Sequence, residues 1–187
     1  MIGNLEIAAN AGASAAILLA GRNSVHTWWT GIIACALFGV LFYQTKLYAD
    51  VALQGFFIVS GVVGWVQWRR GDDGSALPIS HAKLGALAWI VPAGVAAAAA
   101  YGALLHHYTD AYAPFIDSAV LVFSVVAQLL LMQRKVENWA FWLLVNTLAV
   151  PLYASRGLCL TAVLYACYWV NAVVSWLWWR RLARQGA

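Results

Sequence analysis

The first third of this chain reappears near its end. A shift of 111 residues brings matching residues together from Glu6, which falls on Asp117, to Arg70, which falls on Arg181, and it needs no gap. The clearest matches are Trp28 with Trp139, Leu37 with Leu148, Leu41 with Leu152, Leu47 with Leu158, Leu53 with Leu164, Val62-Val63 with Val173-Val174, Trp65 with Trp176, and Trp68-Arg69-Arg70 with Trp179-Arg180-Arg181. A twofold internal repeat in a hydrophobic chain is typical of membrane transporters, in which the substrate site lies between the repeats.

The composition places the chain in a membrane. Of its 187 residues 64% are hydrophobic and only 10% are charged, whereas about a quarter of the residues of a soluble domain are charged. The net charge of +4 comes from single or paired basic residues between apolar segments, a pattern unlike a nucleic-acid-binding surface. Cys35, Cys159 and Cys167 fit no metal-ligand spacing. We therefore expect an all-α integral membrane protein that has the lipid bilayer as a partner and binds no nucleic acid, metal or cofactor.

Seven apolar segments have nearly the length that a helix needs to cross a bilayer, which is about 20 residues. They are residues 4–21, 26–44, 47–68, 83–105, 112–133, 137–154 and 157–179. No basic residue precedes the first segment, so we interpret it as a membrane helix rather than a cleavable signal peptide.

The basic residues between these segments predict the orientation. With seven spans, the loops after spans 1, 3, 5 and 7 share one side of the membrane. These loops carry Arg22, Arg69, Arg70, Lys83, Arg134, Lys135, Arg180, Arg181 and Arg184. The other side carries only Lys46 and Arg156. The positive-inside rule then predicts a cytoplasmic C-terminus and an N-terminus outside.

The repeat also predicts the role of the fourth segment. Residues 4–70 and 112–181 form the two copies, with three spans each. Three crossings leave the chain on the wrong side to repeat itself in the same orientation, and segment 83–105, which has no counterpart in the repeat, restores the parity. We predict one membrane domain, residues 1–187, with a 3+1+3 architecture whose parallel repeats are related by an axis along the membrane normal.

The sixth segment carries the richest set of candidate binding residues. Trp139, Trp142 and Asn146 are spaced i, i+3 and i+7, which places them on one helical face. An amide in a membrane is costly unless it is paired, so we expect Asn146 to face the protein interior. Two indoles beside an amide suit a flat ring with hydrogen-bonding edges, and they favour a cationic ring. Trp139 alone fits an interfacial anchor equally well.

Three further amides are predicted at membrane depth: Gln54 in the first repeat, and Gln128 and Asn171 in the second. Together with Asn146 they supply amides from both repeats, as a substrate site between the repeats requires. Each also fits a hydrogen bond between helices, an alternative that the sequence leaves open.

The remaining polar and aromatic groups are interpreted as structural. Glu6 and Asp117 stand near predicted helix starts, where a carboxylate meets the positive end of the helix dipole, and a proton-coupling site is the alternative interpretation. The tryptophans beside each Arg pair are expected to form aromatic belts at the membrane interface. These are Trp65 and Trp68 in the first repeat and Trp176, Trp178 and Trp179 in the second.

Two stretches resemble the Pnu family of bacterial vitamin transporters. The first runs from Phe38 to Trp68 and contains Phe42-Tyr43-Gln44, Lys46-Leu47-Tyr48-Ala49-Asp50, Leu53-Gln54 and Gly64-Trp65-Val66-Gln67-Trp68. The second contains Pro114-Phe115-Ile116-Asp117-Ser118 and Lys135-Val136-Glu137-Asn138-Trp139-Ala140-Phe141-Trp142, followed by Asn146. The resemblance covers nearly the whole chain apart from segment 83–105.

This resemblance implies a SWEET-like 3+1+3 protein of the bacterial inner membrane, usually a homotrimer. It would carry an unphosphorylated vitamin down its gradient while a cytoplasmic kinase traps the product. The expected substrate is nicotinamide riboside, as in the family's PnuC branch, and Trp139, Trp142, Asn146 and Gln128 would line its site. The second segment opens with Thr27-Trp28-Trp29-Thr30-Gly31, where that branch commonly has an Asn and a Phe before the Gly. This departure leaves a thiamine carrier open, and riboflavin and deoxynucleosides are the substrates of other relatives.

The alternatives from other classes are a membrane enzyme and a scaffold. An enzyme needs a nucleophile and a base within reach of each other, and the scattered Ser and His residues form no such motif. A scaffold would not explain amides at membrane depth in both repeats. We therefore expect a transporter without catalytic residues.

Overall fold

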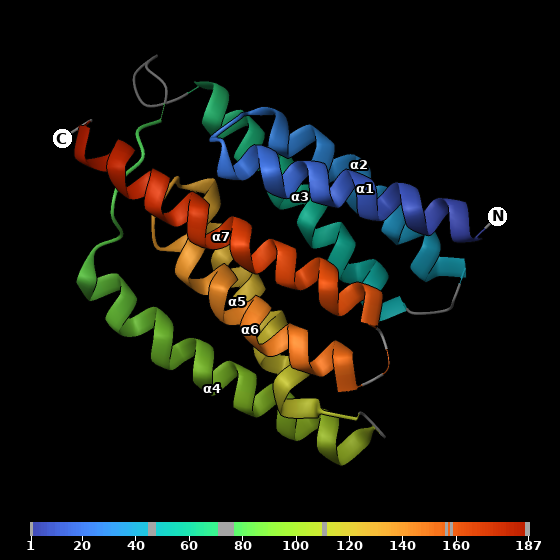
Figure 1. Ribbon diagram of the computed structural model, residues 1–187. Helices are drawn as coiled ribbons and strands as arrows, with labels where there is room; N and C mark the ends of the chain where they lie inside the picture. Colours follow the sequence, from blue (N-terminus) through green and yellow to red (C-terminus); the bar gives the residue numbers. More distant parts are fainter. Residues whose placement is uncertain are drawn as a thin grey trace. The chain divides into compact units, whose positions relative to one another are not determined.

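The computed structural model describes residues 2–44, 48–70, 77–109, 112–155, 157 and 159–185. Within them the chain is helical between short connections, with one isolated β-bridge and no strand. The helices are α1 (Ile2–Gly21), α2 (His26–Gln44), α3 (Tyr48–Arg70), α4 (Leu84–Tyr108), α5 (Pro114–Met132), α6 (Asn138–Ser155) and α7 (Cys159–Gln185) (Figure 1). The prediction of seven helices is confirmed. α7 continues past the predicted end at residue 179 to Gln185. The prediction followed the apolar segment alone, whereas the helix also includes the polar residues after it.

Three of the described helical segments are both long enough and apolar enough to cross a membrane by length and composition. They are Leu84–Tyr108, Pro114–Met132 and Thr161–Gln185, and the apolar segment His26–Leu41 is shorter. In lipid a helix satisfies its own backbone donors and acceptors, which explains why so apolar a chain folds into helices.

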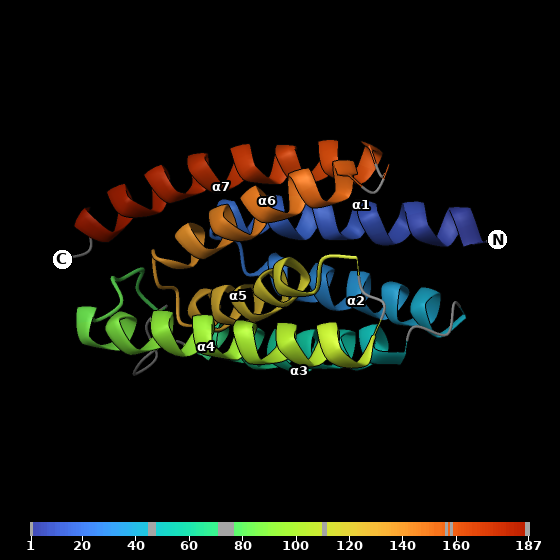
Figure 2. The ribbon, with the colours of Figure 1, turned by 90° about the horizontal axis from the view of Figure 1, so that it is seen from below.

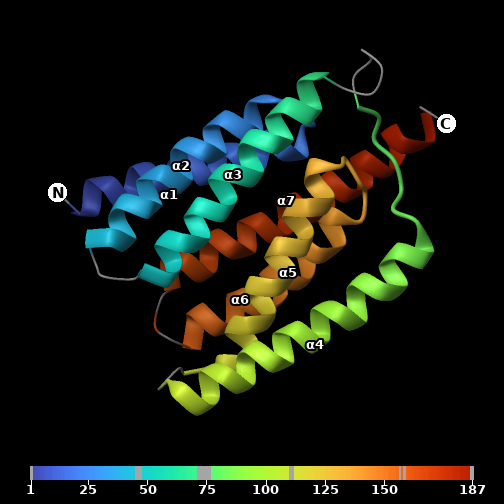
Figure 3. The same cartoon turned by 180° about the vertical axis from the view of Figure 1, so that it is seen from behind.

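The chain divides into two compact units, Met1–Pro78 and Ile79–Ala187. In the first unit α2 packs against both α1 and α3. In the second unit α6 packs against both α5 and α7, and α4 lies along α5 (Figures 2 and 3). The middle helix of each set of three therefore joins the other two, and the helix predicted to link the repeats packs within the second unit.

A pair of buried tryptophans recurs in the two units. In the first, Trp28 of α2 meets Trp68 of α3 edge to face, with ring centroids 5.2 Å apart. In the second, Trp139 of α6 meets Trp179 of α7 in the same way at 5.5 Å. The shift of 111 residues converts one pair into the other.

These pairs correct the expected aromatic belts. Trp68 and Trp179 are only 3% and 0% exposed, so they are core residues and not anchors in the interface. Their helices turn these rings toward the middle helix of the same unit. Trp178 is exposed, which is compatible with the expected role of a belt residue.

The turn before the middle helix is also the same in both units. Asn23 and Arg134 have φ values of 53° and 50°, in the left-handed region. Asn23 N–H donates to Ala20 and Ser24 N–H to Leu19, just as Arg134 N–H donates to Leu131 and Lys135 N–H to Leu130. This pair of hydrogen bonds is the Schellman motif that ends a helix. The two repeats thus share a turn as well as a sequence pattern.

Small residues bring α4 and α5 together. Gly94, Ala98 and Gly102 recur every four residues on α4 and are buried. A Cβ atom at Gly94 would lie 3.0 Å from the ring of Phe123, and one at Gly102 would lie 2.5 Å from the ring of Phe115. Glycine on this face lets the aromatic rings of α5 approach the α4 backbone, which is a common way of packing membrane helices.

Candidate functional site

The candidate residues of the sixth segment lie on α6, the middle helix of the second unit. Trp139 is 2% exposed and packs on Trp179. Trp142, one turn further on, is half-buried and packs against the core that Phe123, Phe141 and their neighbours form between α5 and α6. The two tryptophans therefore have different neighbours. Trp139 packs against α7, and Trp142 packs toward α5.

Asn146 is the buried polar residue at the centre of α6. It is 4% exposed, and its amide makes no hydrogen bond among the described residues. Its nitrogen and oxygen are not among the fully enclosed polar atoms, and the residue lines an open groove. An amide that is almost buried yet unpaired is costly in a membrane protein unless something binds it.

The groove that Asn146 borders lies between α6 and α7 and has a volume of about 390 Å³. Its walls are mostly apolar. They consist of Asn146, Thr147, Val150 and Pro151 from α6, with Ala166, Trp169 and Val170 from α7.

Two polar features of this groove were not predicted from the sequence. The indole Nε1–H of Trp169 donates to Thr147 Oγ1 at 3.1 Å, and that hydroxyl donates to the Leu143 carbonyl at 2.7 Å. Pro151 lies inside α6 and has no N–H to donate to the Thr147 carbonyl, four residues earlier. The sequence did contain a signal for the second feature, namely Pro151 four residues after Thr147 within a predicted helix. The groove thus combines the indole of Trp169 with the Asn146 amide.

The other candidate amides divide between the units. Gln128 on α5 and Asn171 on α7 are half-buried in the second unit, and each interacts with other groups of the protein. Gln54 belongs to the first unit, where it is half-buried on α3 and its Cβ faces Gly39 of α2. The structure thus gathers five of the six candidate residues in the second unit.

The loop before α6 holds a cation that is largely shielded from solvent. Arg134 is 7% exposed, and this burial lowers the pKa of its guanidinium. An arginine stays protonated in proteins even so. No group of three or more potential metal ligands occurs in the described part of the chain.

Comparison with known proteins identifies the relatives of this chain. It is 29% identical to the nicotinamide riboside transporter PnuC of Escherichia coli (strain K12), over 74% of this chain and 69% of that protein. The nicotinamide riboside transporter PnuC of Neisseria mucosa is 28% identical, over 90% and 69%. The riboflavin/roseoflavin transporter RibM of Streptomyces davaonensis is 27% identical, over 90% and 81%.

The fold has a solved counterpart. A crystal structure of the vitamin B3 transporter PnuC superimposes with a TM-score of 0.77 and 24% identity, covering 98% of this chain and 83% of that one. Residues 3–181 match the family described as nicotinamide mononucleotide transporter. The chain therefore belongs to this family, and it is a multi-pass bacterial membrane transporter rather than an enzyme.

Proposed function

We propose that this transporter carries nicotinamide riboside. The observation that carries the proposal is the amide of Asn146, which is almost buried and has no hydrogen-bond partner among the described residues, on the helix that also carries Trp139 and Trp142. Nicotinamide riboside has a cationic pyridinium ring, a carboxamide and ribose hydroxyls. An indole face attracts such a ring by cation–π interaction, and an amide can both donate to and accept from the carboxamide. Two of the relatives named above are nicotinamide riboside transporters, which supports the same choice.

Each candidate residue has a proposed role in this binding. Trp142 stacks on the ring, while Asn146 and Gln128 hydrogen-bond its substituents. Trp139 supports Trp142 from one turn away, and Gln54 and Asn171 supply further amides from the other helices. Thiamine also has a cationic ring, and RibM carries riboflavin, so these two vitamins are the competing substrates.

Binding by the purified protein tests this assignment. Nicotinamide riboside, thiamine and riboflavin are titrated separately into the wild type and into Trp142→Ala, Asn146→Ala and Trp178→Ala. Trp178 is the matched control because it is an exposed tryptophan that neither borders the groove beside Asn146 nor packs against the core that Trp142 contacts. We expect nicotinamide riboside to bind most tightly, and we expect the first two variants to weaken it about tenfold or more, since such a contact contributes on the order of 1–2 kcal/mol.

The outcomes separate substrate from site. Tighter binding of thiamine or riboflavin by the wild type would reject nicotinamide riboside. Equal binding by wild type and both site variants would keep the substrate but move the site away from α6.

We further propose facilitated diffusion, in which a cytoplasmic kinase traps the vitamin and so feeds NAD biosynthesis. The sequence supports this because no paired charges are placed at the middle of a predicted span. Because the substrate is a cation, the vesicles are held at zero membrane potential; uptake without a kinase should then stop when inside and outside concentrations are equal, and a protonophore should not change it. Accumulation above the outside concentration would show ion coupling instead.

We also propose an oligomeric state and an orientation for this protein. The protein forms a homotrimer in the inner membrane, as the resemblance to its family implies, and its N-terminus lies outside. The mass of the detergent-solubilised complex, measured by light scattering with the detergent subtracted, tests the trimer. A mass equal to one chain of 20.3 kDa would reject it.

A further inference from the structure

The segment that leads into α4 is fastened to the loop that leads into α6. Ser80 N–H donates to the Arg134 carbonyl at 3.1 Å, and Val136 N–H donates to the Ser80 carbonyl at 3.0 Å, forming an isolated parallel bridge. Lys135 Nζ adds a hydrogen bond to Ser80 Oγ at 2.8 Å. Residues more than fifty positions apart in the chain are joined in this way.

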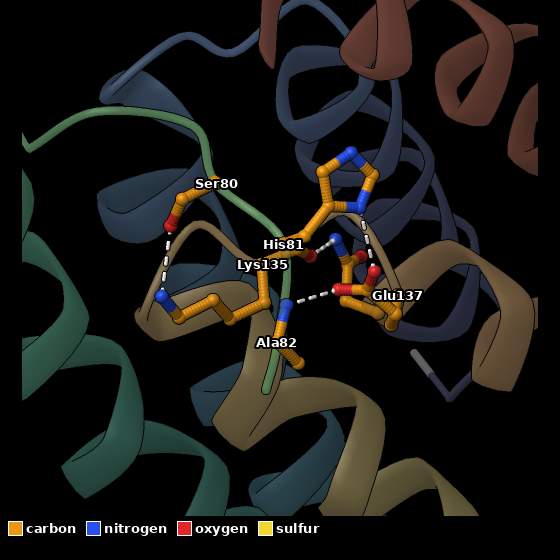
Figure 4. A network of polar contacts seen from close by, with 6 residues as sticks. Ser80, His81, Ala82, Lys135 and Glu137 are labelled. Carbon is orange, nitrogen blue, oxygen red and sulfur yellow. Dashed lines mark hydrogen bonds and ion pairs between the residues drawn. The ribbon is translucent and has the colours of Figure 1, made fainter. Parts of the chain in front are cut away.

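Glu137 closes this connection with both oxygens of its carboxylate. Its Oε1 lies 2.8 Å from His81 Nδ1, and its Oε2 accepts the Ala82 N–H at 2.7 Å (Figure 4). The Glu137 side chain is 21% exposed, against 56% for His81. Hydrogen bonds to a carboxylate are stronger than those between neutral groups. We call the contacts of Ser80, His81 and Ala82 with Arg134, Lys135, Val136 and Glu137 the α4–α6 latch.

The latch is not needed to build the turn in which Glu137 stands. The equivalent turn of the first unit has the same backbone hydrogen bonds, including Thr27 N–H to Ser24 and Trp28 N–H to Val25. There, His26 occupies the position of Glu137, and its Nδ1 accepts from Trp29 of its own helix at 2.8 Å. No second β-bridge occurs among the described residues. The extra contacts of the second turn therefore serve the attachment of α4.

The position of the latch connects α4 to the candidate site. α4 begins at Leu84, two residues after Ala82, and α6 begins at Asn138, directly after Glu137. Asn138 is fully buried, and its Nδ2–H donates to the Lys135 carbonyl at 2.6 Å, so the loop is also held to the first turn of α6. Trp139, Trp142 and Asn146 follow on the same helix. Further along, the glycine face of α4 packs on α5. The latch thus closes a ring of contacts through α4, α5 and α6.

We propose that Glu137 is a positioning residue that makes α4 and the substrate helix α6 move as one rigid body during transport. The inference rests on the proposed function, in which α6 carries the substrate site. A rigid latch preserves the angle at which α6 presents Trp142 and Asn146. Without the latch the substrate still binds, but the second unit transmits its motion poorly.

The test compares Glu137→Gln with Glu6→Gln in the full-length protein. The first change keeps an oxygen for Ala82 but removes the charge that faces His81. The second makes the same change at an exposed carboxylate of the first unit. In vesicles we expect Glu137→Gln to lower the turnover of folded transporter about tenfold and to leave the binding affinity for nicotinamide riboside within about twofold. Glu6→Gln should match the wild type in both.

Hydrogen exchange gives a second readout that needs no substrate. The amides of Ser80, Ala82 and Val136 donate across the latch and should be protected in the wild type. In Glu137→Gln they should exchange faster, and so should the amides that begin α4 and α6. Adding nicotinamide riboside to the wild type should leave the three amides protected, since a rigid body keeps its latch closed.

Three results would overturn the proposal. One is wild-type turnover in Glu137→Gln, another is unchanged exchange in that variant, and the third is loss of protection when substrate binds. If Glu137→Gln does not fold, His81→Ala removes one contact from an exposed ring and should give a smaller fall in turnover; wild-type turnover there would also reject the latch. Failure of the wild type to bind nicotinamide riboside would reject the proposed function alone, because the substrate-free exchange comparison stands without it.

Discussion

Trp28 and Trp139 are held by the packing of their rings. The Nε1–H of each is buried and has no hydrogen-bond partner among the described residues. An unpaired buried donor costs about 1–3 kcal/mol, so the contact with Trp68 or Trp179 must more than offset this cost. An edge-to-face aromatic pair contributes about 0.5–1.5 kcal/mol beyond the area that its rings bury, and burial of the large ring surfaces adds to it. The recurrence of both pairs shows that this solution serves the two units alike.

Gly64 provides the space that the Trp28 ring occupies. A Cβ atom at this position would lie 2.5–2.6 Å from three atoms of the Trp28 ring, which is closer than real contacts allow. We expect Gly64→Ala to lower the stability of the folded protein by about 2 kcal/mol, a typical cost of overpacking a core. Thermal unfolding of purified protein in detergent, followed by tryptophan fluorescence, measures the change.

Gly55→Ala is the matched control on the same helix. A Cβ atom there would meet nothing within 4 Å. Alanine should raise stability slightly, by up to about 1 kcal/mol, through its higher helix propensity. Equal effects at the two glycines would mean that the Trp28 contact does not limit the packing of α2 and α3.

At the level of single residues, the sequence predicts which side chains are candidates for binding better than it predicts which residues they pack against. The spacing of Trp139, Trp142 and Asn146 correctly places them on one helix, and the cost of an amide in lipid correctly predicts that Asn146 is buried. The spacing does not reveal that Trp139 packs on Trp179, because a run of tryptophans beside an Arg pair gives the same pattern for a belt and for a core. Which ring turns inward depends on the crossing of α6 and α7, a tertiary property.

At the scale of elements, α4 shows how small residues set the distance between two helices. A Cβ atom at Gly102 would lie 2.5 Å from the ring and 3.0 Å from the backbone Cα of Phe115. A Cβ atom at Gly94 would touch only the ring of Phe123, at 3.0 Å, and one at Gly85 would meet nothing within 4 Å. A ring can turn aside, but a backbone atom moves only with its helix.

We therefore expect a graded series of stabilities. Gly102→Ala should be the most destabilising, by about 2–3 kcal/mol, Gly94→Ala should cost less, and Gly85→Ala should be neutral or slightly stabilising. Thermal unfolding midpoints of the three purified variants give the order. A loss at Gly85 as large as that at Gly102 would mean that helix backbone strain, and not the approach of α5, explains the effect.

The sequence predicted the elements well but not the connections that fasten them. Apolar length alone gave seven helices, because a membrane segment must satisfy its backbone within itself. The α4–α6 latch went unpredicted, since it joins Ser80 to Lys135 and His81 to Glu137 across 55 and 56 positions of the chain. Polar residues in loops carry no periodicity from which such pairing can be read. The repeat places His26 at the position equivalent to Glu137, but this difference points to the latch only once the structure is known.

At the scale of the whole molecule, the orientation in the membrane depends on the number of crossings. An odd number places the basic loops that contain Arg22, Arg134 and Arg180 together on one side, and the positive-inside rule predicts that this side is the cytoplasmic one. The two ends of α5 offer a direct test. Tyr112, just before its start, and Gln133, just after its end, are both exposed, so a cysteine at either position can react with a soluble reagent.

In a variant whose three native cysteines are replaced by alanine, we expect a membrane-impermeant maleimide to label Tyr112→Cys in intact cells and to leave Gln133→Cys unlabelled until the membrane is opened. The reason is electrostatic, because moving the loop with Arg134 and Lys135 to the outside would oppose the positive-inside preference that the other basic loops share. If only Gln133→Cys were labelled in intact cells, the orientation would be the opposite of the predicted one. Substrate would then meet the latched, basic ends of α4 and α6 from outside the cell, and the proposed direction of uptake would have to be reversed.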